Sequence, residues 1–208
     1  MFTTEQIRSN TRYAIVHAAV FMLVYHGCLV LTSLRPDVRR MFGQWELSIP
    51  LVPGMIVPYF SIYGLFIVSF FLCSNQSERQ VLSRRLAASQ LVAGFIYMVF
   101  PLQSGYQRPV VEGCFAPMFR LLEATDLPYN LAPSLHVTTA ILLGAHYAAR
   151  TQGVMRTLFV AWFTLIAAST MLTWQHHLLD VVAGAMLGMA CLRIGAGSRL
   201  VLTRPAHA

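Results

Sequence analysis

The sequence predicts an all-α integral membrane protein, a six-helix bundle that forms a single transmembrane domain over residues 1–208. The 208 residues are 56% hydrophobic and only 11% charged, and their mean hydropathy is +0.59. A soluble domain usually carries about 25% charged residues, so this balance is typical of a membrane protein. A helix needs roughly 20 apolar residues to cross the bilayer core, and six stretches approach that length. They run approximately over residues 13–32, 55–73, 86–102, 134–149, 154–173 and 178–194.

The first of these stretches is expected to remain in the protein as a span. It begins near Tyr13, is too long for the apolar region of a signal peptide and has no small-residue cleavage site. Polar residues and turn residues, which end apolar helices, separate the stretches from one another. Short loops of this kind occupy residues 34–37, 74–79 and 151–153.

A longer polar stretch, residues 103–133, separates the third span from the fourth. Within it, apolar side chains recur at helical spacing, at Phe115, Met118, Leu121 and Leu122. This pattern predicts a short helix, and its amphipathic character predicts a place at the membrane interface.

The basic residues predict the orientation of the bundle. All fifteen are Arg, which excludes Schiff-base chemistry and a lysine phosphate clamp. Cytoplasmic loops hold the excess of positive charge, and with the N-terminus inside, ten Arg lie inside and five outside. We therefore expect both termini in the cytoplasm and the site described below on the outer face. Arg residues in short loops also fit attraction to anionic lipid, whereas nucleic-acid binding would need a basic face on a soluble fold.

Two polar clusters stand out in these apolar surroundings: residues 133–136 and the pair His176 and Asp180. Ionisable groups are costly within a bilayer, so those that occur there usually serve a site inside the bundle. Asp180 is the only acidic residue in the six predicted spans. The predicted topology brings both clusters to the outer face together.

The first cluster predicts the start of a helix that could hold a phosphate. Pro133 and Ser134 mark that start, with Ser134 as the N-cap. The free backbone N–H groups of the first turn, including that of Leu135, and the positive end of the helix dipole would face the anion. His136 lies in the same turn, where its imidazole could exchange protons with a phosphate oxygen. An ordinary capped helix with an interfacial histidine is the alternative.

The second cluster predicts an oriented imidazole. His176 and Asp180 are four residues apart and share a helical face, so the carboxylate could fix the histidine tautomer and leave the other nitrogen as a nucleophile. His177 is three residues from Asp180 and is equally within reach, and spacing alone does not choose between the two. A structural His–Asp pair between helices is the alternative.

The long loop supplies further candidates. Arg108 could bind phosphate oxygens through two parallel hydrogen bonds. Tyr106, Tyr129 and Asn130 flank the predicted site in sequence and could contact a headgroup, although such residues are also common in loops. The cysteines have no paired spacing, and the adjacent histidines point to different helical faces, so we expect neither a zinc site nor any other cofactor.

Three ordered motifs resemble the signatures of the phosphatidic acid phosphatase type 2 superfamily. They are Arg108-Pro109, then Pro133 to His136, then Ser169 through His176 and Asp180 to Gly184. The resemblance covers about half the chain and implies a lipid phosphatase or phosphotransferase. It implies His176 as nucleophile, Asp180 as its orienter, His136 as acid and base, and Arg108 with Ser134 on phosphate. The resemblance also implies that His176, and not His177, is the nucleophile.

Three positions depart from the usual motifs, with Pro101, Leu135 and Thr170 where the family usually has Lys, Gly and Arg. Two phosphate-binding cations are therefore missing. This pattern resembles the inositol phosphorylceramide synthase branch, whose members transfer a phospho-headgroup between lipids. The resemblance implies a lipid phosphate substrate and a phosphohistidine intermediate, but it does not name the headgroup or the oligomeric state.

A small transporter or proton-relay protein is the main alternative from another class, because intramembrane His and Asp also serve that role. The proline-rich segment 49–54 could then be a broken helix, although no matching break occurs in the second half of the chain. A noncatalytic membrane scaffold is a third possibility.

Overall fold

The computed structural model describes residues 3–107 and 109–195, and all regular secondary structure in this part of the chain is helical. One isolated bridge joins Arg39 and Leu102. The all-α prediction is confirmed. The α-helices are α1 (Thr4–Phe21), α2 (Gly27–Ser33), α3 (Ile56–Phe71), α4 (Gln76–Val99), α5 (Ala116–Thr125), α6 (Leu135–Ala148), α7 (Gly153–Leu172) and α8 (Leu178–Leu192). A π-helical turn, η1 (Met22–His26), joins α1 to α2, and short 3-10 turns are η2 (Gln44–Ser48), η3 (Pro53–Met55) and η4 (Gly113–Phe115).

Three helical segments among the described residues are long and apolar enough to cross a membrane. They are Thr4–Ser33, Pro53–Phe71 and Gly153–Leu172, and Leu178–Leu192 is a shorter apolar helix. Large apolar side chains such as Leu23 and Phe95 lie on the surface, where water would not favour them. These features indicate a membrane protein.

Helix α4 begins earlier than its apolar residues predict. The sequence places residues 76–79 in a polar loop, yet the helix starts at Gln76. The side chain of Asn75 accepts a hydrogen bond from the backbone N–H of Glu78 at 2.9 Å and so caps the first turn. The prediction of a loop was wrong there because a capped helix tolerates charged residues in its first turns.

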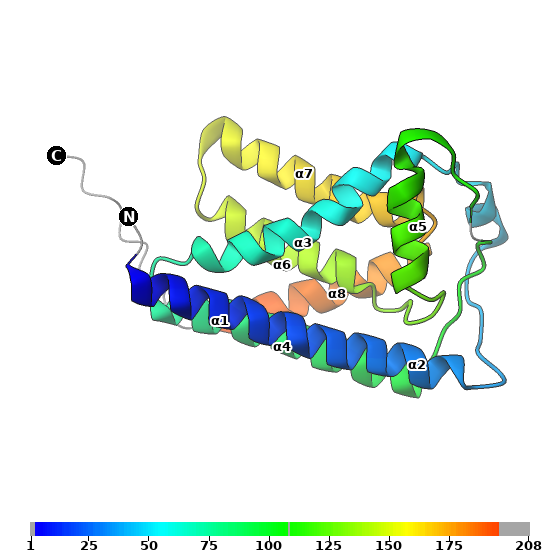
Figure 1. Cartoon of the computed structure of the whole chain (residues 1–208), viewed down its shortest axis with the longest axis horizontal. Helices are drawn as coiled ribbons and strands as arrows, with labels where there is room; N and C mark the ends of the chain where they lie inside the picture. Colours follow the sequence, from blue (N-terminus) through cyan, green and yellow to red (C-terminus); the bar gives the residue numbers. More distant parts are fainter. Residues whose placement is uncertain (1–2, 108, 196–208) are drawn as a thin grey trace.

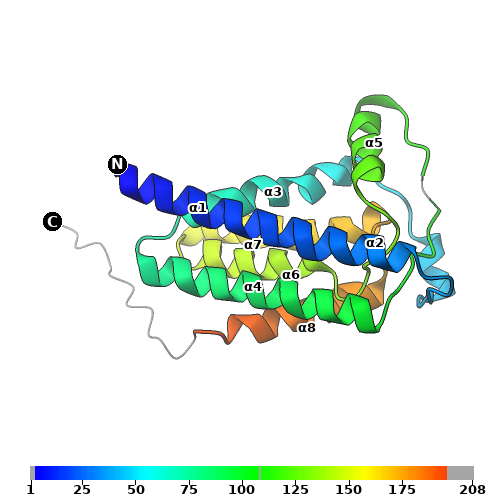
Figure 2. The ribbon, with the colours of Figure 1, turned by 60° about the horizontal axis from the view of Figure 1, so that its bottom comes forward.

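Helix α6 occupies the centre of the bundle and packs against α3, α4, α7 and α8, while α1 lies along α4 (Figure 1). Helix α5 stands across one end of the bundle, together with the turn η2 and the loops between the long helices (Figures 1 and 2). Helix α1 begins and α8 ends at the opposite end (Figure 2). The bundle therefore has one end built of loops and α5, and that end holds the two polar clusters.

The N-cap of α6 and the second turn of α8 approach closely at Gly184. A Cβ atom added there would lie 2.5 Å from the carbonyl oxygen of Ser134, so only glycine fits. The hydroxyl of Thr138 bridges the same junction, because it lies 2.9 Å from the carbonyl oxygens of both Ser134 and Gly184. This close approach positions the start of α6 beside the start of α8.

Candidate active site

The two polar clusters meet at the junction of α6 and α8. The backbone N–H of Ser134 donates to the carbonyl of Asp180 at 3.0 Å. His136, in the first turn of α6, and His176, just before α8, line the same cavity of about 280 Å³. Two imidazoles that are 40 positions apart in the sequence thus line one cavity.

His176 lies beside Asp180, with 3.5 Å between its Nδ1 atom and the Oδ2 atom of the carboxylate. This is an ion-pair separation and is longer than a strong hydrogen bond. Asp180 is fully buried and accepts a 2.8 Å hydrogen bond from the backbone N–H of His177. The carboxylate is therefore anchored, and it faces one nitrogen of the imidazole while the other nitrogen is left for a ligand.

The turn that carries His176 is held by the end of α7. The backbone N–H groups of Gln175 and His176 both donate to the carbonyl of Thr170, at 2.9 and 3.0 Å. Trp174 has a φ of 60°, in the left-handed region that a bulky residue rarely adopts. Backbone strain of this kind persists only where surrounding contacts enforce it, and it concentrates at functional sites.

His136 packs among aromatic rings. Its ring stacks on Tyr59 with centroids 4.0 Å apart and meets the edge of Tyr63 at 5.7 Å. Its Nε2 atom is buried and has no hydrogen-bond partner among the described residues. Since buried polar atoms are normally hydrogen-bonded, this nitrogen is poised to receive a ligand.

His177 has different surroundings from its neighbour. Its side chain is fully buried, Nε2 accepts a hydrogen bond from the backbone N–H of Gly105 at 3.0 Å, and Nδ1 lies 3.3 Å from Glu46 Oε2. Both ring nitrogens are thus engaged. Of the two adjacent histidines, His176 is the one that lines the cavity.

Ser134 caps α6, as the sequence predicts, and its hydroxyl accepts from the backbone N–H of Val137 at 3.3 Å. Its side chain is fully buried. Leu135 is also buried, and its side chain lies on the cavity wall. Arg108, the predicted phosphate-binding cation, lies outside the described residues.

The three loop candidates occupy different positions around the site. Tyr106 stacks on Trp174 and on His177, and burial raises the pKa of its phenol to about 12, with the nearby carboxylates of Glu46 and Asp180 adding to the rise. Tyr129 lines a small polar pocket that also includes His176. Asn130 is buried, and its side chain donates to the carbonyl of Tyr25 at 2.8 Å. Asn130 thus contributes to the cavity wall.

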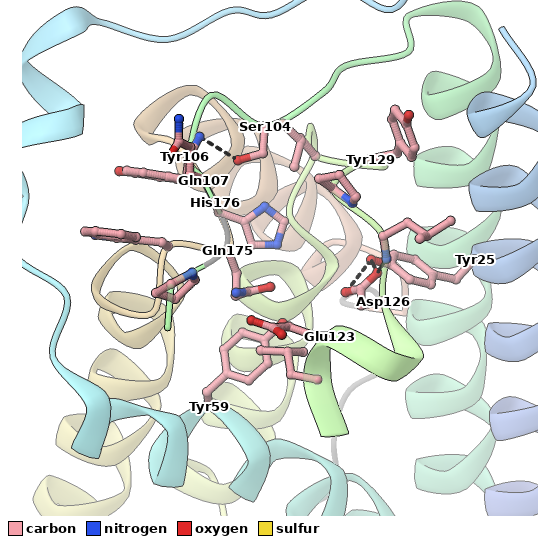
Figure 3. Close-up of a pocket in the computed structure, with 16 residues that line it drawn as sticks. Tyr25, Tyr59, Ser104, Tyr106, Gln107, Glu123, Asp126, Tyr129, Gln175 and His176 are labelled. Carbon is pink, nitrogen blue, oxygen red and sulfur yellow. Dashed lines mark hydrogen bonds between the residues drawn. The ribbon is translucent and has the colours of Figure 1, made fainter. Parts of the chain in front are cut away.

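Sequence reasoning missed two residues on the opposite wall. The hydroxyl of Tyr25, within the π-helical turn η1, donates to both carboxylate oxygens of Asp126, at 2.9 and 3.1 Å (Figure 3). Burial raises the pKa of Asp126, and the hydrogen bond from Tyr25 opposes that rise. A π-helical turn is often a functional feature, yet nothing in the local sequence of this segment predicts one.

Figure 3 shows the polar mouth of the site, with His176 at its centre between Tyr106 and Ser104 on one side and the Tyr25–Asp126 pair on the other. The mouth has a volume of about 50 Å³ and shares His176 with the 280 Å³ cavity. That cavity in turn shares His136 with an apolar cavity of about 200 Å³. The polar mouth, the cavity lined by both histidines and the apolar cavity are therefore neighbours in that order.

Fold and site together define a helical membrane protein in which two histidines line one cavity and a buried carboxylate lies beside one of them. Within the described ranges, no three His, Cys, Asp or Glu side chains are grouped so that they could hold a metal ion. The family model of the PAP2 superfamily, the phosphatidic acid phosphatase type 2 group, matches residues 55–194. The chain belongs to this superfamily. Its members are generally phosphatases, and membership supports a phosphatase or phosphotransferase type of function.

The chain is also similar to an uncharacterised protein of Methanocaldococcus jannaschii. The two are 26% identical over 175 residues, which cover 77% of this chain and 70% of the relative. This similarity names no substrate.

Proposed function

We propose that this protein is a membrane lipid phosphatase or phosphotransferase that works through a phosphohistidine intermediate. One observation carries the proposal: His176, with a buried carboxylate at its Nδ1 atom, lines a cavity that is also lined by His136, whose buried Nε2 atom has no hydrogen-bond partner among the described residues. A nucleophile held by an orienting group, with a second proton-transfer group across the same space, is the arrangement that such a displacement needs.

In the first step, Nε2 of His176 attacks phosphorus in line with the ester oxygen. The N–P bond forms, the P–O bond to the leaving group breaks, and His136 in its protonated form gives a proton to the departing oxygen. Asp180 stabilises the positive charge that develops on His176. The products of this step are an alcohol and the phosphohistidine.

In the second step, His136, now neutral, takes a proton from the attacking hydroxyl. When water attacks, the N–P bond breaks and phosphate leaves, so the reaction is a hydrolysis. When a lipid alcohol attacks, the phosphoryl or phospho-headgroup is transferred. The attacking hydroxyl alone separates a phosphatase from a transferase.

The phosphate would be held by Arg108, by the backbone N–H of Leu135 and by the positive end of α6, with Ser134 fixing the start of that helix. Charge on the equatorial oxygens spreads in the transition state, and such fixed donors stabilise it without reorganisation. We propose that the reaction is independent of metal ions.

A lipid substrate is supported by the way the polar mouth, the histidine-lined cavity and the apolar cavity adjoin one another. The cavity of about 200 Å³ is lined mainly by apolar side chains and meets the site at His136. A phosphate at His176 could then be joined to an acyl chain in the apolar space. The departures at Pro101, Leu135 and Thr170 favour, as a second candidate, a headgroup transferase of the inositol phosphorylceramide synthase type.

We also propose that residues 1–208 form one domain of six spans, with α5 at the membrane interface, both termini in the cytoplasm and the site on the outer face. The start of α1 and the end of α8 at one end of the bundle support this topology (Figure 2), as does the excess of Arg on that side. In a Cys114→Ser background, which removes the exposed native thiol, single cysteines introduced as Asp37→Cys and Thr151→Cys should react with an impermeant thiol reagent from opposite faces of intact cells or vesicles. Reaction from one face would contradict the topology.

The direct test is to give the purified protein a panel of lipid phosphate monoesters and phosphodiesters, with and without diacylglycerol or ceramide, and with EDTA as a metal chelator. Free phosphate from monoesters, insensitive to EDTA, is the result expected of the phosphatase. Headgroup transfer to an acceptor lipid would establish the second candidate. Turnover of no lipid would overturn both and favour a transporter.

A further inference from the structure

A buried cluster closes the outer edge of the site and includes a residue from outside the region matched by the family model. Glu46, in η2, is only 3% exposed and lies before residue 55, where that match begins. Its carboxylate accepts hydrogen bonds from the backbone N–H groups of Gly43 at 2.6 Å and Leu178 at 2.7 Å. It therefore ties the loop between α2 and α3 to the start of α8.

The same carboxylate fixes the tautomer of His177. The backbone N–H of Gly105 is a donor, so Nε2 of His177 must accept and carries no proton. The ring proton is then on Nδ1, which donates to Glu46 Oε2 at 3.3 Å. Since the partners of the Glu46 carboxylate among the described residues are all donors, the cluster requires a carboxylate and a neutral imidazole in this one tautomer.

Aromatic rings hold the imidazole from both faces. Phe42 stacks on one side with centroids 4.7 Å apart, and Tyr106 stacks on the other at 4.4 Å. The hydroxyl of Tyr106 donates to the backbone carbonyl of Glu46 at 3.1 Å. We call Glu46, Gly105, Tyr106 and His177 the His177 clamp.

We propose that Glu46 and His177 are positioning residues that hold the loop of residues 103–107 against the start of α8, and that they do so only while His177 is neutral. The consequence for catalysis rests on the proposed function of His176. That histidine directly precedes His177, and the carboxylate of Asp180 is anchored on the backbone N–H of His177. The clamped loop leads directly into the Arg108 motif in the sequence.

Protonation of His177 would break the clamp for a geometric reason. An imidazolium carries a proton on Nε2, which would then point at the N–H of Gly105, so two donors would face each other. The loop would have to move away from α8, which would shift the phosphate-binding side of the site relative to His176.

Among residues 3–107 and 109–195, few charged or titratable groups surround His177. Glu46 faces it from η2, Tyr106 from the loop, and Asp180 and His176 from its own segment. Burial lowers the pKa of His177, while Asp180 and Glu46 oppose that effect. Protonation, and with it release of the loop, is thus expected below pH 6.5, the ordinary value for histidine.

The experiment compares His177→Phe and Glu46→Gln with the wild type over pH 5 to 8. Phenylalanine keeps the stacking but has no ring nitrogens, and glutamine places an NH₂ donor among donors. The matched controls are His146→Phe and Glu78→Gln, whose native side chains contact Ser69 and Arg150 at the other end of the bundle. We expect kcat of both clamp variants to fall about 10- to 100-fold at pH 7.5, the loss that misplacing a catalytic group by about 1 Å causes. The decline of kcat toward acid pH that the wild type shows should be weaker in both variants.

A second readout does not depend on turnover. In protein labelled with ¹⁵N-histidine, the resonances that disappear in His177→Phe belong to His177 and report its tautomer. We expect the proton on Nδ1, and we expect these resonances to titrate over the same pH range in which kcat of the wild type declines. Wild-type kcat and pH profile in both clamp variants, or a neutral His177 with its proton on Nε2, would overturn the proposal. If the wild type turns over no lipid, the proposed function fails, and the tautomer alone decides whether the clamp exists.

Discussion

The backbone N–H of Ser134 donates to the carbonyl oxygen of Asp180 at 3.0 Å, which joins the cap of α6 directly to the first turn of α8. The bond places the two motifs in register through the main chain and needs no side chain for that purpose. Small shifts between α6 and α8 should therefore change the separation of His136 and His176 and so lower the rate of turnover.

Gly184→Ala tests this junction. The added methyl group would lie 2.5 Å from the carbonyl oxygen of Ser134, which is backbone and cannot swing aside. We expect the variant to lose about 1–3 kcal/mol of stability, the usual cost of overpacking, and to lose activity more than tenfold as α6 and α8 separate. Thermal unfolding in detergent and lipid turnover measure the two effects.

Gly64→Ala is the matched control, because an added Cβ at Gly64 in α3 meets nothing within 4 Å. Alanine is favoured over glycine inside a helix by about 0.5–1 kcal/mol, so this variant should be at least as stable as the wild type and fully active. Equal behaviour of the two variants would show that the α6–α8 contact does not control the site.

His176→Asn tests the nucleophile. Asparagine is polar but cannot form the phosphohistidine, so turnover should fall at least about 1000-fold, and no acid-labile phosphate should remain on the protein after brief exposure to labelled substrate. His146→Asn, at the other end of the bundle, should keep both the label and the turnover. Label on His176→Asn would mean that another residue is phosphorylated.

The sequence predicted those features of the fold and site that depend on local pattern. Apolar length located the long helices, and the start of α6 at Ser134 followed from its capping residue. His176 also lies 3.5 Å from Asp180, but the predicted shared helical face was wrong, because α8 begins only at Leu178 and the N-cap residue His177 is extended. The start of α4 was missed because Asn75 can cap a charged turn as readily as it can end a loop.

Partners that are distant in the chain could not be found in this way. Tyr25 and Asp126 are 101 positions apart, and Glu46 and His177 are 131 apart. Their contacts depend on how α5 and the turn η2 fold across the end of the bundle, which no periodicity encodes. The π-helical turn that carries Tyr25 also has no local sequence signal.

Ala18→Phe tests whether the apolar cavity holds a lipid chain. Ala18 lines the cavity of about 200 Å³ that meets His136, and a phenyl ring would fill part of it. We expect KM for a long-chain lipid phosphate to rise about tenfold, since apolar burial of a few methylene groups would be lost, while a short-chain soluble ester is unaffected. Ala19→Phe, at the neighbouring exposed position of α1, is the control. The same loss for both esters would exclude chain binding there.

Acidification should weaken the folded protein through His177. Burial lowers the pKa of His177 in the folded state below 6.5, the value expected in the unfolded chain. At a pH between the folded and the unfolded pKa, the unfolded chain binds more protons than the folded protein, so the free energy of unfolding decreases as pH falls. The stabilising contribution of the neutral imidazole is complete above pH 6.5 and is lost as pH falls through the folded pKa.

The buried carboxyl of Asp126, whose pKa is raised, acts in the opposite direction, so the effect must be measured as a difference between wild type and His177→Phe. Denaturant unfolding in detergent should show the wild type clearly more stable at pH 7.5 and a smaller gap at pH 5. A gap that stays constant over this range would mean that His177 has the same proton affinity in both states, and the hydrogen bond from Gly105 would then not require its neutral form.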